Sequence, residues 1–300
     1  MLQTEIREVG GLRGRRRAED FLELTKPRVV LMVLITTFVG FYLGSQGATN
    51  WIKLLHTLLG TTLAAGGTLA LNQYLERDVD ARMKRTRLRP LPNHRLEPVE
   101  ALIFGIAITL GGVFYLIFAV NLLSGLVTVA IAASYLFLYT PLKQKTSFCS
   151  IVGAVPGALP PVTGWVAARG EAGLEAWILF AILFLWQIPH SLAIAWLYRE
   201  DYAMAGMKLL PVVHPDGRST GHQIVNHCLA LITVSLLPTL VGLAGPLYFF
   251  SALLLGALFL LYGVDLAISR SVEAARRLLF ASIVYLPLQL LILALDKRLG

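Results

Sequence analysis

Residues 54–89 read LLHTLLGTTLAAGGTLALNQYLERDVDARMKRTRLR, an apolar run that ends in a dense cluster of charge. Residues 54–74 contain no Asp, Glu, Lys or Arg, whereas residues 72–89 contain three acids and six bases. The apolar run is long enough to cross a bilayer as a helix. Charged side chains at the end of such a helix are costly unless they are solvated, paired or used in function. The ionisable residues of this cluster are therefore functional candidates.

Three oxygen-bearing side chains in the cluster have a spacing that predicts a binding face. Asn72, Glu76 and Asp80 follow one another at intervals of four residues, so a helix places their oxygens on one face over roughly 12 Å. Such oxygens are the ligands that Mg²⁺ prefers beside bound phosphates. The bases that follow could neutralise a diphosphate, with arginine forming bidentate contacts. The pattern favours a Mg²⁺–diphosphate site.

A solvated helix end is the alternative that the same residues allow. Asp78 lies four residues before Arg82, and Asp80 lies four residues before Lys84, which is the spacing of ion pairs on a helix surface. Asp78 falls on roughly the opposite face from Glu76 and is the better candidate for a structural pair. The bases could likewise serve only to orient the membrane helix. Spacing alone leaves both interpretations open.

The composition predicts an all-α polytopic membrane protein. The chain is 56% hydrophobic and only 15% charged, with a mean hydropathy of +0.68, whereas soluble domains contain about 25% charged residues. We expect one nine-helix transmembrane domain over residues 28–296, preceded by a cytoplasmic tail at 1–27. The apolar runs that predict the nine helices lie near 28–46, 54–74, 99–119, 122–140, 147–168, 175–197, 223–243, 246–267 and 277–295.

The distribution of basic residues predicts the orientation in the membrane. With the N-terminus inside, the cytoplasmic segments hold 22 of the 26 Lys and Arg residues, and the outer segments hold four. This bias follows the positive-inside rule and predicts a cytoplasmic N-terminus and an outer C-terminus. The net charge of +8 is therefore explained by topology and by anionic membrane lipid, rather than by a nucleic-acid partner.

A second polar loop, residues 198–222, follows the sixth predicted helix. Tyr198, Arg199, Asp201 and Lys208 are its candidate functional residues. One carboxylate with a tyrosine is a poorer metal site than three oxygen ligands, so this loop could orient a second substrate or share a metal. A merely solvated loop is an equally good interpretation of these residues.

Polar and helix-breaking residues also occur inside the apolar runs. In the sixth run, Gln187, His190 and Ser191 share one helix face, and Pro189 should kink the helix. His190 could be a packing residue, a metal ligand or a proton carrier. In the fifth run, prolines and glycines predict a broken or tightly packed helix.

At these residues the chain resembles the UbiA superfamily of membrane prenyltransferases, and within it the branch that farnesylates heme. The resemblance covers most of residues 25–215, and no single motif would carry it alone. The stretches that carry it are Thr25-Lys26-Pro27-Arg28, Asn72 to Thr86, Arg89-Pro90-Leu91-Pro92, Tyr139-Thr140-Pro141-Leu142-Lys143, Trp186-Gln187-x-Pro189-His190, Tyr198-x2-Asp201-Tyr202-x2-Ala205-Gly206 and Leu210-Pro211.

The chain departs from the family pattern at three places. Glu76 stands where the family usually has Asp, which keeps the charge and the ligand type, and Ser191 stands where Phe is common. Relatives that accept aromatic substrates have an Asp-x3-Asp pair in the second loop, whereas this chain has Tyr198 and Tyr202. The last difference favours the heme branch.

The resemblance implies a UbiA-like helix bundle with an active-site cavity that faces the cytoplasm. It also implies transfer of a farnesyl group from farnesyl diphosphate to a vinyl group of heme b, giving heme O in the cell (inner) membrane. A downstream heme A synthase or oxidase assembly factor is the expected protein partner. The implied residue roles are Mg²⁺ ligation by Asn72, Glu76 and Asp80, catalytic roles for these three with Tyr198 and Asp201, diphosphate binding by Lys84, Arg85 and Arg89, and contacts with heme from Arg199, Lys208 and His190.

Three alternative functions compete with this interpretation. The first is a UbiA-type enzyme that prenylates an aromatic quinone precursor. The second is a transporter, but its intramembrane charges should be buried near the bilayer midplane, whereas the acids here gather at the inner boundary. The third is a heme-binding assembly factor, which would need no diphosphate site.

Overall fold

The computed structural model describes residues 17–298. Within these residues, nine helices are long and apolar enough to cross a membrane, as the hydropathy pattern predicts. Of the predicted tail at 1–27, residues 1–16 lie outside the described part, and residues 17–24 form a short helix. The transmembrane helices are α2 (Pro27–Gly44), α3 (Trp51–Asp80), α4 (Pro98–Ala119), α5 (Leu122–Ala133) continued by the π-helix η1 (Ser134–Tyr139) and α6 (Thr140–Leu142), α7 (Cys149–Ala158) with α8 (Pro160–Arg169), α9 (Leu174–Leu197), α12 (Arg218–Ser235) with α13 (Leu237–Leu240), α14 (Pro246–Ser269) and α15 (Val272–Leu295).

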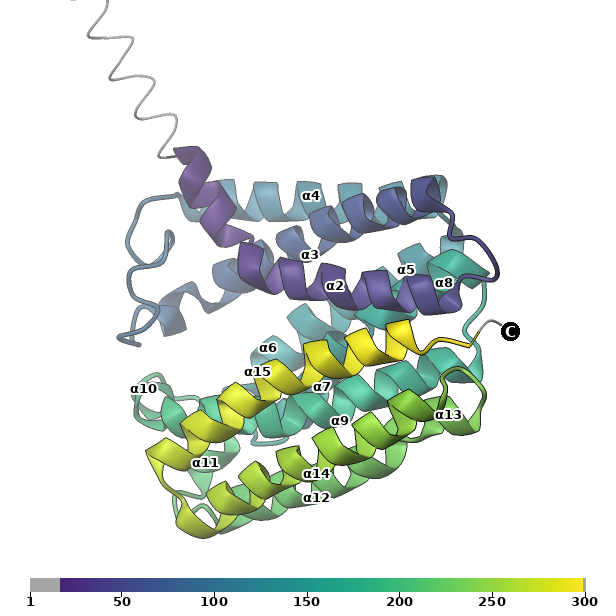
Figure 1. Cartoon of the computed structure of the whole chain (residues 1–300). Helices are drawn as coiled ribbons and strands as arrows, with labels where there is room; N and C mark the ends of the chain where they lie inside the picture. The colour runs from purple at the N-terminus through teal and green to yellow at the C-terminus, as the bar shows by residue number, and fades with distance from the viewer. Residues whose placement is uncertain (1–16, 299–300) are drawn as a thin grey trace, which may run out of the picture.

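The helices form two groups that flank a middle layer (Figure 1). Helices α2, α3 and α4 lie together in one group, and α9, α12, α14 and α15 lie together in the other. The broken helix α7–α8 connects them, because α8 packs on α2 and α7 packs on α9. The largest apolar core lies within the second group and extends through α7 and α8 to α2.

Two glycines let α2 and α8 approach at backbone distance. A Cβ atom at Gly164 would lie 1.9 Å from the backbone oxygen of Thr37, and one at Gly40 would lie 2.0 Å from that of Pro161. Membrane helices associate through such small residues because lipid supplies no hydrophobic drive between them. The helix is also interrupted at Leu159, before Pro160. The fifth span is thus both broken and tightly packed, as its Pro and Gly content predicts.

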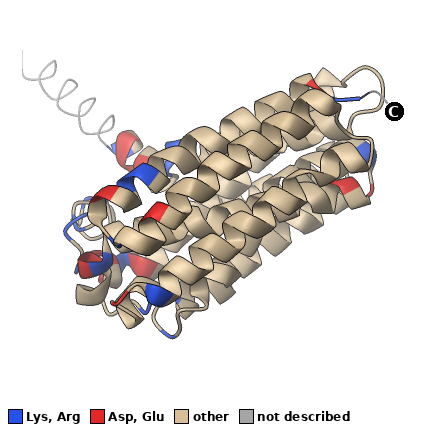
Figure 2. Cartoon of the chain, turned by 60° about the horizontal axis from the view of Figure 1, so that its bottom comes forward, with Lys and Arg blue, Asp and Glu red and all other residues tan. Residues whose placement is uncertain are grey.

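Charged side chains gather at one end of the bundle, which carries the loop at 81–97 and the short helices α10 (Arg199–Met204) and α11 (Leu210–Val213) (Figures 1 and 2). Helix α3 reaches this end and continues to Asp80, six residues beyond the predicted end at residue 74. This extension keeps Glu76 and Asp80 on regular helix. The three oxygen-bearing residues therefore share one rigid element.

The contact between α2 and α8 predicts a large difference between two glycine substitutions. Gly164→Ala should lower the melting temperature of the purified protein, because the new methyl group overlaps backbone and overpacking costs about 1–3 kcal/mol. Gly111→Ala is the matched control, since a Cβ atom there meets nothing within 4 Å; it should leave stability unchanged or raise it by about 1 kcal/mol. Equal melting temperatures for the two variants would contradict the packing argument.

Candidate functional site

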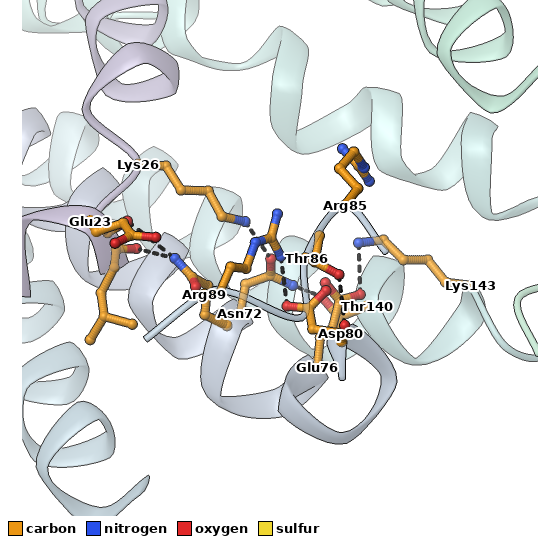
Figure 3. Close-up of polar contacts among 12 residues, drawn as sticks. Glu23, Lys26, Asn72, Glu76, Asp80, Arg85, Thr86, Arg89, Thr140 and Lys143 are labelled. Atoms are coloured by element: carbon orange, nitrogen blue, oxygen red, sulfur yellow. Dashed lines mark hydrogen bonds and ion pairs between the residues drawn. The ribbon is translucent and has the colours of Figure 1, made fainter. Parts of the chain in front are cut away.

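A polar cluster on α3 pairs each of its three oxygen-bearing side chains with a cation (Figure 3). Asn72, Glu76 and Asp80 are all buried. The three cations come from three different segments of the chain, which lie far apart in sequence. The contacts are Lys26 Nζ to Asn72 Oδ1 at 3.2 Å, Lys143 Nζ to Glu76 Oε1 at 2.8 Å and Arg89 Nη1 to Asp80 Oδ2 at 2.6 Å.

Lys26 reaches the cluster from the junction between the N-terminal helix and α2. Its backbone has φ 50° and ψ 67°, in the left-handed region that non-glycine residues rarely adopt. Gln73 holds the preceding turn by donating its amide to the carbonyl oxygens of Glu23 (3.3 Å) and Leu24 (3.0 Å). Burial, together with the nearby charges of Arg89 and Lys143, lowers the pKa of Lys26 to about 7. An anion bound here would relieve that repulsion.

Lys143 reaches the cluster from the π-helical end of the fourth span. Pro141 has no N–H to donate, which favours local departure from α-helical bonding. Thr140 instead donates its hydroxyl to the carbonyl oxygen of Tyr135 (2.9 Å) and accepts from Asn72 Nδ2 (3.1 Å). Burial alone would lower the pKa of Lys143, but its contacts with Tyr139 and Glu76 outweigh burial and raise it. Lys143 is therefore a fixed positive charge.

Arg89 reaches the cluster from the loop that follows α3. The Thr86 hydroxyl donates to the backbone oxygen of Asp80 at 2.8 Å, which folds the loop back over the end of the helix. The Arg89 guanidinium then meets the Asp80 carboxylate in an ion pair in which the acid is almost fully buried. Arg89 and Lys143 balance the two carboxylates, and Lys26, with a pKa of about 7, is a third basic group that gains a full charge when an anion binds beside it. This extra basic group suits an anionic ligand.

An apolar cavity of about 250 Å³ adjoins the cluster. Its lining continues the face of α3 that bears Asn72, through Thr68 and Ala65 to Thr61, and includes Tyr139 beneath the ammonium group of Lys143. Helices α2, α5, α7, α8 and α9 and the π-helix η1 supply the remaining walls. The site therefore joins a cationic head region to a largely apolar pocket, which suits an amphipathic anion with a hydrocarbon tail.

Arg85 and Lys84 do not contact the three oxygens. The backbone N–H of Arg85 donates to Asp201 Oδ2 at 3.4 Å, and its guanidinium donates to the hydroxyl of Tyr202 at 3.1 Å and lies 4.9 Å from the ring centroid of Tyr198. Arg85 therefore ties the first loop to the second. Lys84 is exposed and forms no hydrogen bond or ion pair with another described residue.

The remaining predicted residues lie on or near the second loop. The guanidinium of Arg199 lies 4.6 Å from the ring centroid of Trp196, and the exposed Lys208 donates its backbone N–H to the carbonyl oxygen of Lys143 at 2.7 Å. His190 lies deeper, with Nδ1 at 2.7 Å from the hydroxyl of Ser282 on α15 and its ring stacked on Trp186. The structure thus does not bring His190 into contact with the α3 cluster. Asp78 is exposed and pairs loosely with Arg77, at 3.9 Å.

Sequence reasoning assigned no role to Lys26 or Lys143. Both lie in short motifs that the resemblance includes, Thr25-Lys26-Pro27 and Pro141-Leu142-Lys143. Their charges were explained by the positive-inside bias, which concerns topology rather than a site. A lysine within two residues of a proline at a membrane boundary was the available signal, because proline restricts the backbone there.

The donor set fits a magnesium ion that is completed by substrate. Among residues 17–298, no cluster of three or more His, Cys, Asp or Glu side chains could hold a metal alone. Mg²⁺ is usually bound by one or two carboxylates together with substrate phosphates. Glu76 and Asp80, with the amide oxygen of Asn72, supply that kind of set. In the structure each of these side chains accepts a hydrogen bond from a basic side chain.

Both the fold and the sequence match a known class of membrane enzymes. Residues 33–284 match the UbiA prenyltransferase family, and the chain belongs to this family. It is 50% identical to a protoheme IX farnesyltransferase of Solibacter usitatus over 287 residues, covering 93% of this chain and 98% of the relative.

Solved structures of the class share the fold. A structure described for digeranylgeranylglyceryl phosphate synthase has a TM-score of 0.79 and 18% identity, covering 94% of this chain and 98% of that one. A UbiA homolog from Archaeoglobus fulgidus bound to GPP and Mg²⁺ has a TM-score of 0.64 and 16% identity, covering 92% and 99%.

Substitutions in the ion pair of Lys143 and Glu76 should affect the stability of the protein and its affinity for diphosphate in different ways. Lys143→Met should lower the free energy of unfolding by about 3–5 kcal/mol, because it leaves a buried carboxylate unpaired. Adding Glu76→Gln should recover most of that loss, without restoring affinity for inorganic diphosphate. Thermal unfolding and calorimetric titration measure the two effects, and Lys145→Met is the exposed control. Restored diphosphate binding in the double variant would contradict the assignment.

Proposed function

We propose that the chain transfers the farnesyl group of farnesyl diphosphate to a vinyl group of heme b and so forms heme O. The observation that carries the proposal is the junction of a cationic, oxygen-lined cluster with an apolar cavity. The farnesyl tail would occupy the cavity, and the diphosphate would lie at the cluster. The name of the Solibacter relative supports farnesyl as the group transferred and heme as its acceptor.

The first step breaks the bond between the allylic carbon and the diphosphate oxygen. Lys26, Arg89 and Lys143 compensate the charge that grows on the leaving diphosphate, and they act strongly because they are preorganised in a water-poor site. Asn72, Glu76 and Asp80 would hold Mg²⁺, which when bound supplies further charge stabilisation to the same group. The apolar walls keep bulk water from the allylic cation.

The second step joins the farnesyl carbon to a heme vinyl carbon, and a water molecule supplies the hydroxyl group of the product while releasing a proton. Arg199 and Lys208 are proposed to contact the heme propionates, and Tyr198 and Asp201 to orient heme at the loop that Arg85 holds. His190, which lies deeper in the bundle than the second loop, is proposed to contact heme from inside the bundle. Its hydrogen bond to Ser282 leaves Nε2 as the nitrogen that could meet heme.

The proposed location is the cell (inner) membrane, with the N-terminus in the cytoplasm and the C-terminus outside. The positive-inside bias supports this orientation, and the charged loops gather at one end of the bundle (Figure 2). Farnesyl diphosphate and heme would then both be bound from the cytoplasmic side. The product is proposed to pass to a heme A synthase or an oxidase assembly factor.

The two carboxylates of α3 should be essential for turnover. Glu76→Ala and Asp80→Ala should each abolish Mg²⁺-dependent formation of heme O from farnesyl diphosphate and heme b, measured by chromatography of the extracted pigment. Glu76→Asp should retain activity, because the charge and ligand type are unchanged, and Asp78→Ala is the exposed control. Retained turnover in both alanine variants would remove the metal assignment, and product formed only from an aromatic acceptor would replace heme as substrate.

A substitution that narrows the cavity should weaken binding of the hydrocarbon tail of the substrate and leave binding of its diphosphate unchanged. A Cβ atom at Gly157 would lie 2.0 Å from Oε1 of Gln187, so Gly157→Leu should push that amide into the cavity. We expect at least a tenfold fall in kcat/KM for farnesyl diphosphate, about 1.4 kcal/mol, with unchanged inhibition by inorganic diphosphate. Gly111→Leu, which faces open space, is the control. Equal weakening of farnesyl diphosphate and inorganic diphosphate would contradict the placement of the tail.

A further inference from the structure

Arg95 lies outside the cluster on α3 yet contacts both segments that deliver two of its cations. Its guanidinium pairs with Asp20 and, at 2.7 Å, with Glu23, both on the N-terminal helix at 17–24. The same guanidinium donates to the backbone oxygen of Leu88 at 3.0 Å. One side chain therefore connects the N-terminal helix to the loop after α3.

The contacts with Asp20 and Glu23 lie within two helical turns before Lys26. The left-handed backbone of Lys26 is an unfavourable conformation that persists only where the surroundings enforce it. Enforcement comes from Gln73 on α3 and from Leu24, which is fully buried in an apolar cluster with Leu91 and Leu96 of the loop. The docking of the N-terminal helix on this loop thus decides where the Lys26 ammonium group points.

The contact with Leu88 lies directly before Arg89. This part of the loop belongs to no α-helix, so tertiary contacts must fix its backbone. Arginine suits the task, because its planar guanidinium offers several donors in fixed directions. Arg95 uses them toward two carboxylates and one carbonyl group that belong to different segments.

We propose that Arg95 is a positioning residue that sets the separation between Lys26 and Arg89 around the bound diphosphate. The inference rests on the proposed function, since it assumes that these two cations hold the diphosphate. Arg95 itself contacts none of Asn72, Glu76 and Asp80 and so acts through its neighbours. A merely structural surface ion pair would contribute little to stability and would leave diphosphate affinity unchanged.

The test compares Arg95→Gln with Arg87→Gln in the full-length protein in lipid nanodiscs. Both variants remove one positive charge from the same loop, but Arg87 is exposed and forms no side-chain bond with another described residue. We expect Arg95→Gln to weaken binding of inorganic diphosphate with Mg²⁺ at least tenfold and to raise KM for farnesyl diphosphate. Arg87→Gln should change neither by more than about twofold. Unchanged affinity in Arg95→Gln overturns the inference.

A double-mutant cycle with Lys26→Met separates positioning from a simple loss of charge. If Arg95 acts by placing Lys26, then Arg95→Gln should weaken diphosphate binding less in the Lys26→Met background than in the wild type. Equal losses in both backgrounds would show that Arg95 does not act through Lys26 and would overturn the inference. Wild-type protein that binds diphosphate but makes no heme O would instead overturn the proposed function, while leaving this cycle measurable.

Discussion

Two carboxylates buried at the end of a membrane helix must be compensated, and this constraint organises the charged end of the molecule. Glu76 and Asp80 are almost fully buried, and an isolated ionised group in such a place is very costly. Arg89 and Lys143 neutralise the two carboxylates, and a third basic side chain, Lys26, lies beside them. Stability alone would need only neutralisation, so the third basic group argues for a ligand that carries negative charge into the site.

The oxygens and the cations are held in different ways. Asn72, Glu76 and Asp80 share one helix and keep a fixed mutual geometry. Their cations come from the turn before α2, from the loop after α3 and from the π-helical end of the fourth span, so each depends on tertiary contacts. Membrane helices that pack through small residues supply a rigid frame for such contacts. The packed helices therefore hold the charged side chains of the site in place, although they contribute none of its charge through their own contacts.

Sequence patterns predicted the helical elements and the oxygen face because both are local properties. Nine apolar runs identify nine helices by length, and a spacing of four residues determines one face of α3. The partners of that face were not predictable in the same way. Local spacing offered Lys84, four residues after Asp80, as a partner only in the alternative of a solvated helix end, and the folded loop presents Arg89 instead. Lys26 and Lys143 lie tens of residues away, and only the packing of helices brings them to α3.

The difference between local spacing and tertiary packing also explains why the side chains of Arg85 and Arg89 contact different parts of the molecule, although the two residues are four apart. Thr86 bonds to the backbone oxygen of Asp80 and turns the chain, so the residue before it faces the second loop while Arg89 returns to the helix. Arg85 then stacks on Tyr198 and anchors the loop at which heme is proposed to bind. Under the proposed function, one basic run thus supplies a cation to the diphosphate end of the site and a clamp to the acceptor end. A reaction between two such substrates needs both ends at a fixed separation, which this short turn would help to fix.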